Sequence, residues 1–174
     1  MGIDELSSET TASHSAVQRL LAAYSDTVNR RAWAELSTLF LADARIELTP
    51  LQRPPIVVIG PDALGRFIEG AIARFDFFEF VLLNSRVEIG QAGHSARGRN
   101  FICEYRRARE TGSWTQVFGV YHDLYRRVEG RWLFEQRSFD PLASAGGDNV
   151  VFPIPARLEA LFADPLAEAP EGAG

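Results

Sequence analysis

One predicted strand carries the side chains best suited to chemistry. Within the alternating segment Trp114–Arg127, the residues Gly119, Tyr121, Asp123 and Tyr125 share one face because they are spaced by two. A tyrosine hydroxyl on that face can donate a hydrogen bond to a carbonyl or an oxyanion. A carboxylate that loses hydration has a raised pKa and can act as a general base. Tyr121 and Asp123 are therefore candidate catalytic residues.

Arg137 lies on the next predicted strand and leaves two interpretations of Asp123 open. If the two side chains pair, they form a structural ion pair or an anion site; if they do not, Asp123 remains available as a base. Glu104 and Arg106 share a face of an earlier strand. We interpret them as a cross-strand salt bridge rather than as catalytic groups.

The three histidines, His14, His94 and His122, lack the spacing of a metal-binding pair on a helix or strand. We expect His14 and His94 to be exposed to solvent. His122 alternates with Tyr121 and therefore points to the opposite face of the strand. The single cysteine, Cys103, excludes an intramolecular disulfide and a multi-cysteine metal site. We expect no metal and no cofactor.

Composition removes several classes of function. The 174 residues include 18 basic residues, all of them arginine, and the net charge is −5. Without lysine there is no Schiff-base chemistry and no phosphate-loop lysine. The acidic balance argues against nucleic-acid binding. No apolar run approaches the roughly 20 residues that span a membrane, and the N-terminus does not resemble a secretory signal. We expect a cytoplasmic protein that acts away from membranes.

The spacing of apolar residues predicts the elements that position these groups. A helical period indicates a first helix over 17–28, a short second helix over 33–40 and a third over 62–75. Two short strands are expected at 44–48 and 56–59. From Phe80 the period changes to two, which predicts four antiparallel strands joined by short turns, at 80–89, 95–107, 114–127 and 132–139. The fold class is α+β.

The chain is long enough for one domain, with short segments outside it. We expect a mobile tail over 1–12, the domain over 13–142, an extension with a short helix over 143–164, and a disordered tail over 165–174. The chain holds 12 Phe, 4 Tyr and 3 Trp. This density suits a pocket for a flat or polycyclic apolar ligand.

Three segments resemble a known family. They are AVQRLLAAYSDTVNRRAWAELSTLFLADARIEL, GPDALGRFI and VFGVYHDLYRRVEGRWLFEQRSF. In this order and spacing, over Ala12 to Pro141, they are similar to the SnoaL-like group of the nuclear-transport-factor-2-like superfamily. The resemblance implies a cone-shaped barrel, in which the N-terminal helices pack in a strongly curved antiparallel sheet around one apolar pocket. It also implies that Gly119 and Tyr121 face this pocket.

The resemblance bears directly on mechanism. In the dehydratase and dehydrochlorinase relatives, an Asp late in the first helix orients a His that removes a proton from carbon. The matching positions here are Asn29 and Phe80, and neither side chain can take part in proton transfer. We keep Asn29 as a hydrogen-bond donor beside Tyr121, with Asp123 as the base. The residues expected to contact a ligand are Tyr24, Trp33, Phe80, Asn84 and Arg137.

Two functions remain open. The first is a cofactor-independent dehydratase, isomerase or cyclase of the SnoaL-like type that acts on a small hydrophobic molecule. The second is a non-catalytic module of the same fold that binds a small molecule or a protein after loss of the dyad. A small subunit of a ring-hydroxylating oxygenase is a weaker third interpretation, because its opening motif is not evident. Relatives commonly dimerise through the convex face of the sheet, so we expect a homodimer.

Overall fold

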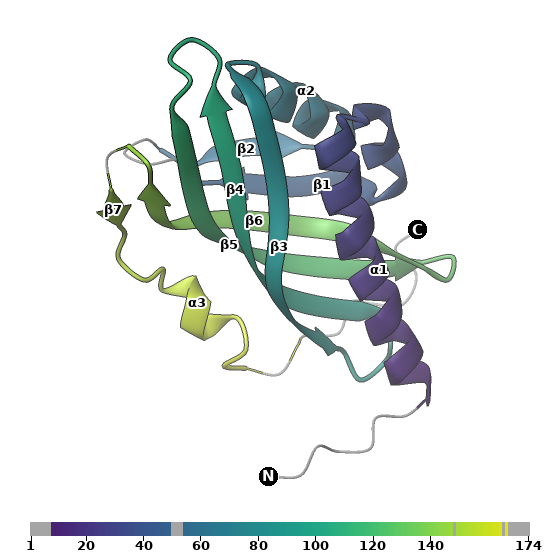
Figure 1. Cartoon of the computed structure of the whole chain (residues 1–174). Coiled ribbons are helices and arrows are strands. Elements are labelled where there is room, and N and C mark those ends of the chain that lie inside the picture. The colour runs from purple at the N-terminus through teal and green to yellow at the C-terminus, as the bar shows by residue number, and fades with distance from the viewer. Residues whose placement is uncertain (1–7, 50–53, 148, 165, 167–174) are drawn as a thin grey trace.

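The computed structural model describes residues 8–49, 54–147, 149–164 and 166. Its elements are, in chain order, α1 (Ser8–Arg30), the 3-10 helix η1 (Trp33–Thr38), β1 (Phe40–Leu48), β2 (Ile56–Ile59), α2 (Pro61–Ile72), β3 (Phe75–Ile89), β4 (Ser95–Ala108), β5 (Trp114–Val128), β6 (Arg131–Ala145), β7 (Val150–Val151) and α3 (Arg157–Ala160). Figure 1 shows α1 and α2 packed on one side of a single curved sheet. The predicted α+β cone is confirmed.

The sheet has the strand order β2-β1-β6-β5-β4-β3, with β7 also paired to β6. Strands β3 to β6 are antiparallel neighbours in chain order, as the short turns predict. The expectation of a wholly antiparallel sheet is wrong at one pair, because β1 runs parallel to β6. No turn joins these two strands, so turn spacing could not reveal the pair. The sheet is therefore mixed.

Several elements extend further than the sequence pattern indicates. Helix α1 begins at Ser8, so residues 8–12 are helical where a tail was expected. Strand β3 begins at Phe75, and β6 continues through Pro141 to Ala145, past the expected domain boundary at 142. Proline usually interrupts a strand, but this one sits opposite Gly119 beside a register shift. The expected tails at 1–7, and at 165 and 167–174, lie outside the described residues.

The buried face of α1 fills the concave side of the sheet. Val17, Leu21 and Val28 are at most 2% exposed. The ring of Tyr24 meets the rings of Phe40, Phe80 and Phe134 edge-on, with centroids 5.6–5.8 Å away. Edge-to-face contacts of this kind add to the free energy gained by apolar burial. Within the described residues, no helix is both long and apolar enough to cross a membrane.

Irregular registers help to bend the sheet around this core. The β3–β4 register shifts between Leu82 and Asn84, and the β5–β6 register shifts between Phe118 and Gly119 and again between Leu124 and Tyr125. Such bulges increase local twist and bend a strand. Gly119 has a second role, because a Cβ atom there would lie 2.2 Å from the ring of Phe139. Glycine thus lets the Phe139 ring lie across β5.

Asn29 fastens the end of α1 to β3. Its Nδ2 donates to the carbonyl oxygen of Phe80 at 2.9 Å, and its Oδ1 accepts from the Phe80 N–H at 2.8 Å. An amide satisfies both backbone groups at once because it carries a donor and an acceptor. A carboxylate at this position would lack the donor. The Asn29 side chain is thus used for a bond between helix and sheet.

We expect Asn29→Ala to lower the free energy of unfolding by about 1–3 kcal/mol, because two backbone groups of β3 lose their partner. Urea unfolding measures the loss. Asp26→Asn is the matched control: Asp26 is exposed and pairs with Arg30 across one helical turn, so the change should cost at most about 0.5 kcal/mol. Equal losses in the two variants would contradict this role of Asn29.

Candidate functional site

A cavity of about 450 Å³ opens between the concave face of the sheet and α2. Its walls are mostly apolar and include Phe67, Ile68 and Phe75. The polar and charged side chains that line it are Tyr24, Thr49, Arg74, Glu104, Arg106, Tyr121 and Arg137. A mostly apolar cavity with a few convergent polar groups is the usual form of a small-molecule site.

Two cross-strand rows bring the inner polar groups together. In the first row, Ile46 of β1, Arg137 of β6 and Asp123 of β5 are lateral neighbours. In the second, Leu48, Phe139 and Tyr121 occupy the same three strands. Side chains two residues apart on a strand share a face, so both rows point into the cone.

Arg137 and Asp123 form a buried, two-bonded ion pair. Arg137 Nε lies 2.8 Å from Asp123 Oδ1, and Nη2 lies 2.8 Å from Oδ2. The two side chains are 2% and 0% exposed. The guanidinium carbon also lies 4.2 Å from the ring centroids of Tyr24, Tyr121 and Phe134. Planar Arg suits both the fork of bonds and the ring stacking.

One nitrogen of this guanidinium is left over. Arg137 Nη1 is buried and has no hydrogen-bond partner among the described residues. A buried donor without a partner is energetically costly, so its presence beside a cavity indicates a place for an acceptor. Burial lowers the pKa of Arg137, but the adjacent Asp123 carboxylate outweighs this effect and raises the pKa above its ordinary value. The side chain is thus a permanent cation.

The two tyrosines of the site are neutral hydrogen-bond donors. Burial raises the pKa of Tyr121 well above its ordinary value, and the nearby charge of Glu104 raises it further. Burial likewise raises the pKa of Tyr24, against the opposing effect of Arg137. Both hydroxyls therefore keep their protons at neutral pH. Since Glu104 affects both phenols, its carboxylate lies within electrostatic range of them.

A second layer of bonds fixes Asp123. Asn100 Nδ2 donates to Asp123 Oδ2 at 2.6 Å, and the Tyr125 hydroxyl donates to the same oxygen at 3.2 Å. Ser85 in turn donates to Asn100 Oδ1 at 2.5 Å. Fixed donors of this kind hold a carboxylate in one orientation. Sequence reasoning missed Asn100, although it lies four residues from Glu104 on β4, and this even spacing places both side chains on the inward face.

The structure separates the predicted site residues into two groups. Tyr24, Tyr121 and Arg137 line the cavity. Asp123 lies behind Arg137 and does not line the cavity, which matches the paired alternative rather than the free base. Phe80 is buried with its ring 5.6 Å from that of Tyr24 and 6.1 Å from that of Tyr121, so it packs behind these two side chains and does not line the cavity.

The other predicted contacts lie elsewhere. Trp33 packs near Gly65 of α2, and Asn84 is exposed at the bulge of β3; neither lines the cavity. Asn29 is bonded to the backbone of Phe80. Among the described residues that line the cavity, Glu104 is the only carboxylate. Arg106 Nε donates to Glu104 Oε2 at 3.0 Å, so the predicted salt bridge forms, but within one strand.

The histidines do not reach this cavity. His122 is buried on the outward face of β5, as its parity predicts. His94 is exposed in the turn before β4. His14 was expected in solvent but is half-buried on α1, because the helix begins earlier than predicted. Among the described residues, no three His, Cys, Asp or Glu side chains gather as metal ligands.

Asp123→Asn is close to isosteric and leaves the buried Arg137 cation without its counter-charge. We expect it to lower the free energy of unfolding by about 3–5 kcal/mol. Asp76→Asn is the matched control, because Asp76 pairs with Arg107 where both side chains are well exposed, at 31% and 40%. That change should cost at most about 1 kcal/mol. Urea unfolding of both variants tests the difference, and a small loss in Asp123→Asn would refute the buried pair.

A family model of the SnoaL-like domain matches residues 9–138. No curated protein matches the sequence. A proposed scytalone dehydratase from Novosphingobium aromaticivorans is 19% identical in sequence, with a TM-score of 0.70 over 95% of this chain and 100% of that chain.

Two further solved structures are similar. A hexachlorocyclohexane dehydrochlorinase from Novosphingobium barchaimii is 19% identical, with a TM-score of 0.70 over 84% of this chain and 98% of that chain. An NTF2-like protein with a cystatin-like fold from Novosphingobium aromaticivorans is 18% identical, with a TM-score of 0.66 over 92% and 99% of the two chains. Similarity at this level of identity shows a shared fold, whereas the family model covers most of the sequence. The chain belongs to the SnoaL-like domain family.

Proposed function

We propose that the protein is a cofactor-independent enzyme that eliminates water from, isomerises or cyclises a small hydrophobic molecule bound in the cavity. The observation that carries this proposal is Arg137 Nη1, which has no hydrogen-bond partner in the described part of the chain and is buried beside the neutral phenols of Tyr24 and Tyr121 in the cavity wall. Fixed donors in a site that excludes water stabilise an oxygen that gains negative charge during reaction.

Glu104 supplies the proton acceptor that such chemistry needs. Both of its bonds from Arg106 end on Oε2, which leaves Oε1 for a proton from the ligand. In the proposed step, Glu104 takes a proton from the carbon next to a carbonyl group of the substrate. The electron pair moves to the carbonyl oxygen, which is held by Arg137 and Tyr121. Asp123 acts indirectly, because it fixes Arg137, and Asn29 fixes β3.

The second candidate is a binding module of the same fold without catalysis. The resemblance supports it, because the positions matched to the His and Asp of the dehydratase relatives hold Phe80 and Asn29 in this sequence. Under this alternative, the same donors bind an oxygen of the ligand, and Glu104 serves only as the partner of Arg106. Catalysis therefore requires the Glu104 carboxylate to accept a proton, whereas binding alone does not.

We expect Glu104→Gln and Tyr121→Phe each to reduce turnover by about 10²–10⁴-fold. Turnover is measured by mass spectrometry over a panel of hydroxylated and carbonyl-bearing polyketides, terpenoids and aromatic compounds. Tyr105→Phe is the control, because Tyr105 lies on the outward face of β4 and is absent from the cavity wall. If a compound binds but neither the wild type nor any variant converts it, the binding module is supported instead.

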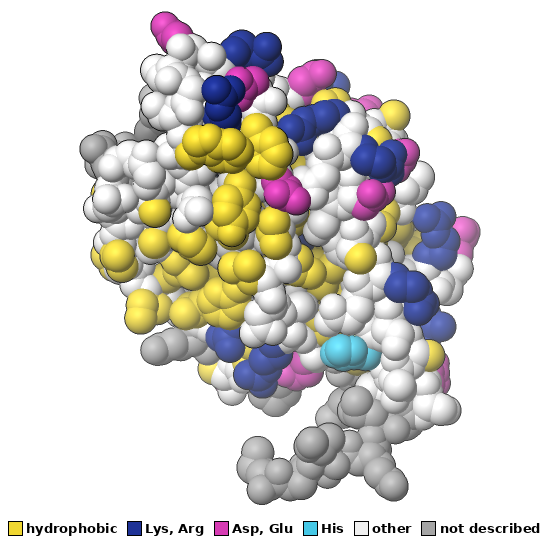
Figure 2. Space-filling model, in the orientation of Figure 1, with side chains coloured by type: hydrophobic (Ala, Val, Ile, Leu, Met, Phe, Trp, Pro, Cys, Tyr) yellow, Lys and Arg dark blue, Asp and Glu magenta, His cyan; other side chains and the backbone are white. Residues whose placement is uncertain are grey.

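We also propose that the protein is a cytoplasmic homodimer that does not engage nucleic acid, in keeping with its net charge of −5. Figure 2 shows hydrophobic side chains gathered on the face of the sheet that is turned toward the viewer. Two exposed aromatic side chains pack together on the sheet, Phe77 at 40% and Trp114 at 54%, with their rings 5.2 Å apart. Patches of this kind mark interaction surfaces.

Light scattering at micromolar concentration should return a dimer mass for the wild type. Trp114→Glu places a charge in the contact and should return a monomer mass, while circular dichroism remains unchanged. Arg19→Glu, on the exposed side of α1, is the control for an added carboxylate. A monomer mass for the wild type would refute the proposed dimer.

A further inference from the structure

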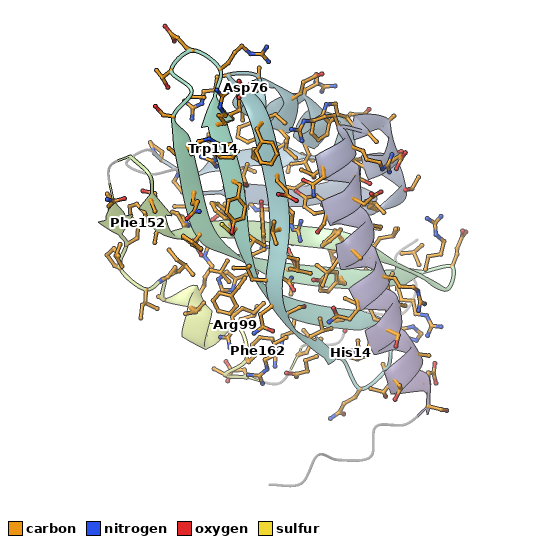
Figure 3. The ribbon with its side chains drawn as sticks, viewed as in Figure 1. His14, Asp76, Arg99, Trp114, Phe152 and Phe162 are labelled. Atoms are coloured by element: carbon orange, nitrogen blue, oxygen red, sulfur yellow. The ribbon has the colours of Figure 1, made fainter. Side chains whose placement is uncertain are left out.

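The C-terminal residues 152–162 cross the outward face of the sheet, and we call this segment the strap. Figure 1 shows it on the side of the sheet opposite α1. The strap begins with the Phe152 N–H, which donates to the Leu142 carbonyl at 2.9 Å. It ends with the ring of Phe162, which the guanidinium groups of Arg86, Arg97 and Arg99 approach at 4.0, 5.0 and 5.3 Å. Figure 3 shows Arg99 and Phe162 side by side.

Polar side chains beneath the strap are buried although they point outward. His122 and Asp140 are each 5% exposed and Ser138 is 3% exposed. The outward face of a single sheet meets water unless another segment covers it. Arg157 of the strap lies directly on this surface, with its Nε 2.8 Å from Asp140 Oδ2. The strap therefore encloses these side chains.

The covered row lies between the two rows that form the inner end of the cavity. Glu47 of β1, Ser138 of β6 and His122 of β5 are lateral neighbours. Each is flanked in sequence by residues of the two inward rows, because side chains alternate along a strand. A shift of the outward row therefore displaces the backbone that carries Tyr121, Arg137 and Phe139.

Arg157 also bridges the parallel pair of strands in the sheet. Strands β1 and β2 join the meander through the parallel pairing of β1 with β6, where the register is interrupted between Phe40 and Arg45. Arg157 Nη2 lies 3.1 Å from Glu47 Oε1 on β1, while its Nε forms an ion pair with Asp140 on β6. One side chain thus holds both strands of this pair from outside.

We propose that the strap is a brace for the cavity: Arg157 is a positioning residue that sets the spacing of β1 and β6, and His122 beneath it makes the brace sensitive to acid. This rests on the cavity of the proposed function as a ligand site, but not on any reaction there. The cavity-lining side chains on β1 and β6, including Leu48 and Arg137, hold their positions only while the strap is closed.

The acid response follows from the groups around His122. Its Nε2 lies 3.6 Å from Asp140 Oδ2 on β6, and Arg99 of β4 and Arg157 of the strap also act on it, as does Asp123 on its own strand. Burial lowers the pKa of His122, against the opposing effect of Asp140. When the strap opens, His122 meets water and regains its ordinary pKa of about 6.5. The open state then binds more protons, so falling pH favours opening.

Arg157→Ala tests the brace, with the neutral fluorophore N-phenyl-1-naphthylamine as the cavity probe. We expect its dissociation constant to rise about fivefold or more, as for other couplings between separate sites. Hydrogen exchange should quicken in peptides that cover 45–48 and 137–141. Arg45→Ala is the matched control, because Arg45 also pairs with Glu47, at 2.9 Å, but lies outside the strap. It should leave both measurements unchanged.

If Arg157→Ala quickens exchange only within 150–162 and leaves probe affinity unchanged, the strap is not a brace. If the wild type does not bind the probe at all, the ligand cavity of the proposed function fails instead. The exchange at 45–48 and 137–141 still decides the brace in that case.

The acid response is tested separately with His122→Gln. In the wild type, exchange of the strap, corrected for the intrinsic effect of pH, should rise as the pH falls from 7.5 to 5.5. In His122→Gln it should stay flat, while His94→Gln, in an exposed turn, should behave as the wild type. The same acid profile in His122→Gln and the wild type would overturn the role of His122.

Discussion

The buried pair of Arg137 and Asp123 is the constraint on which the interior of this protein depends. A guanidinium that is almost fully enclosed needs a counter-charge, and the carboxylate in turn needs fixed donors. Asn100 and Tyr125 meet the second need. The flat faces of the guanidinium require apolar or aromatic cover, which Tyr24 of α1, Tyr121 of β5 and Phe134 of β6 provide. The position of the first helix is thus coupled to the charge pair on the sheet.

The sequence predicts the elements well where the signal is local. The alternation from Phe80 onward gives the meander, and the parity of Tyr121, Asp123 and His122 gives the correct face for each. The pairing of β1 with β6 could not be predicted, because it joins residues about ninety positions apart with no turn between them. The extent of β6 was missed for a different reason. Pro141 predicts the end of the strand, and its tolerance within β6 depends on its pairing with Gly119 beside a register shift, which the sequence does not show.

The site was predicted less completely than the fold. Parity places Glu104 and Asn100 on the same inward face, but it does not say which of them reaches a cavity and which supports a neighbour. That depends on where α2 lies over the sheet, which is a non-local property. For Asp123 the sequence left two alternatives, a free base or a partner of Arg137. The register of β5 against β6 decides between them: it places Asp123 directly opposite Arg137, and the observed 2.8 Å contacts correspond to the partner.

Neither Phe80 nor Asn29 is available for proton transfer in the cone. The ring of Phe80 packs against the rings of Tyr24 and Tyr121, so this wall can neither accept nor donate a proton. Asn29 is engaged by the backbone of β3. The groups proposed to act on the ligand, Glu104, Tyr121 and Arg137, lie on β4, β5 and β6, and the outer surface of β5 and β6 is covered by the strap. Because a shift of these strands would misplace the donors and the acceptor together, a segment that covers their outer face stabilises the arrangement of the polar groups inside.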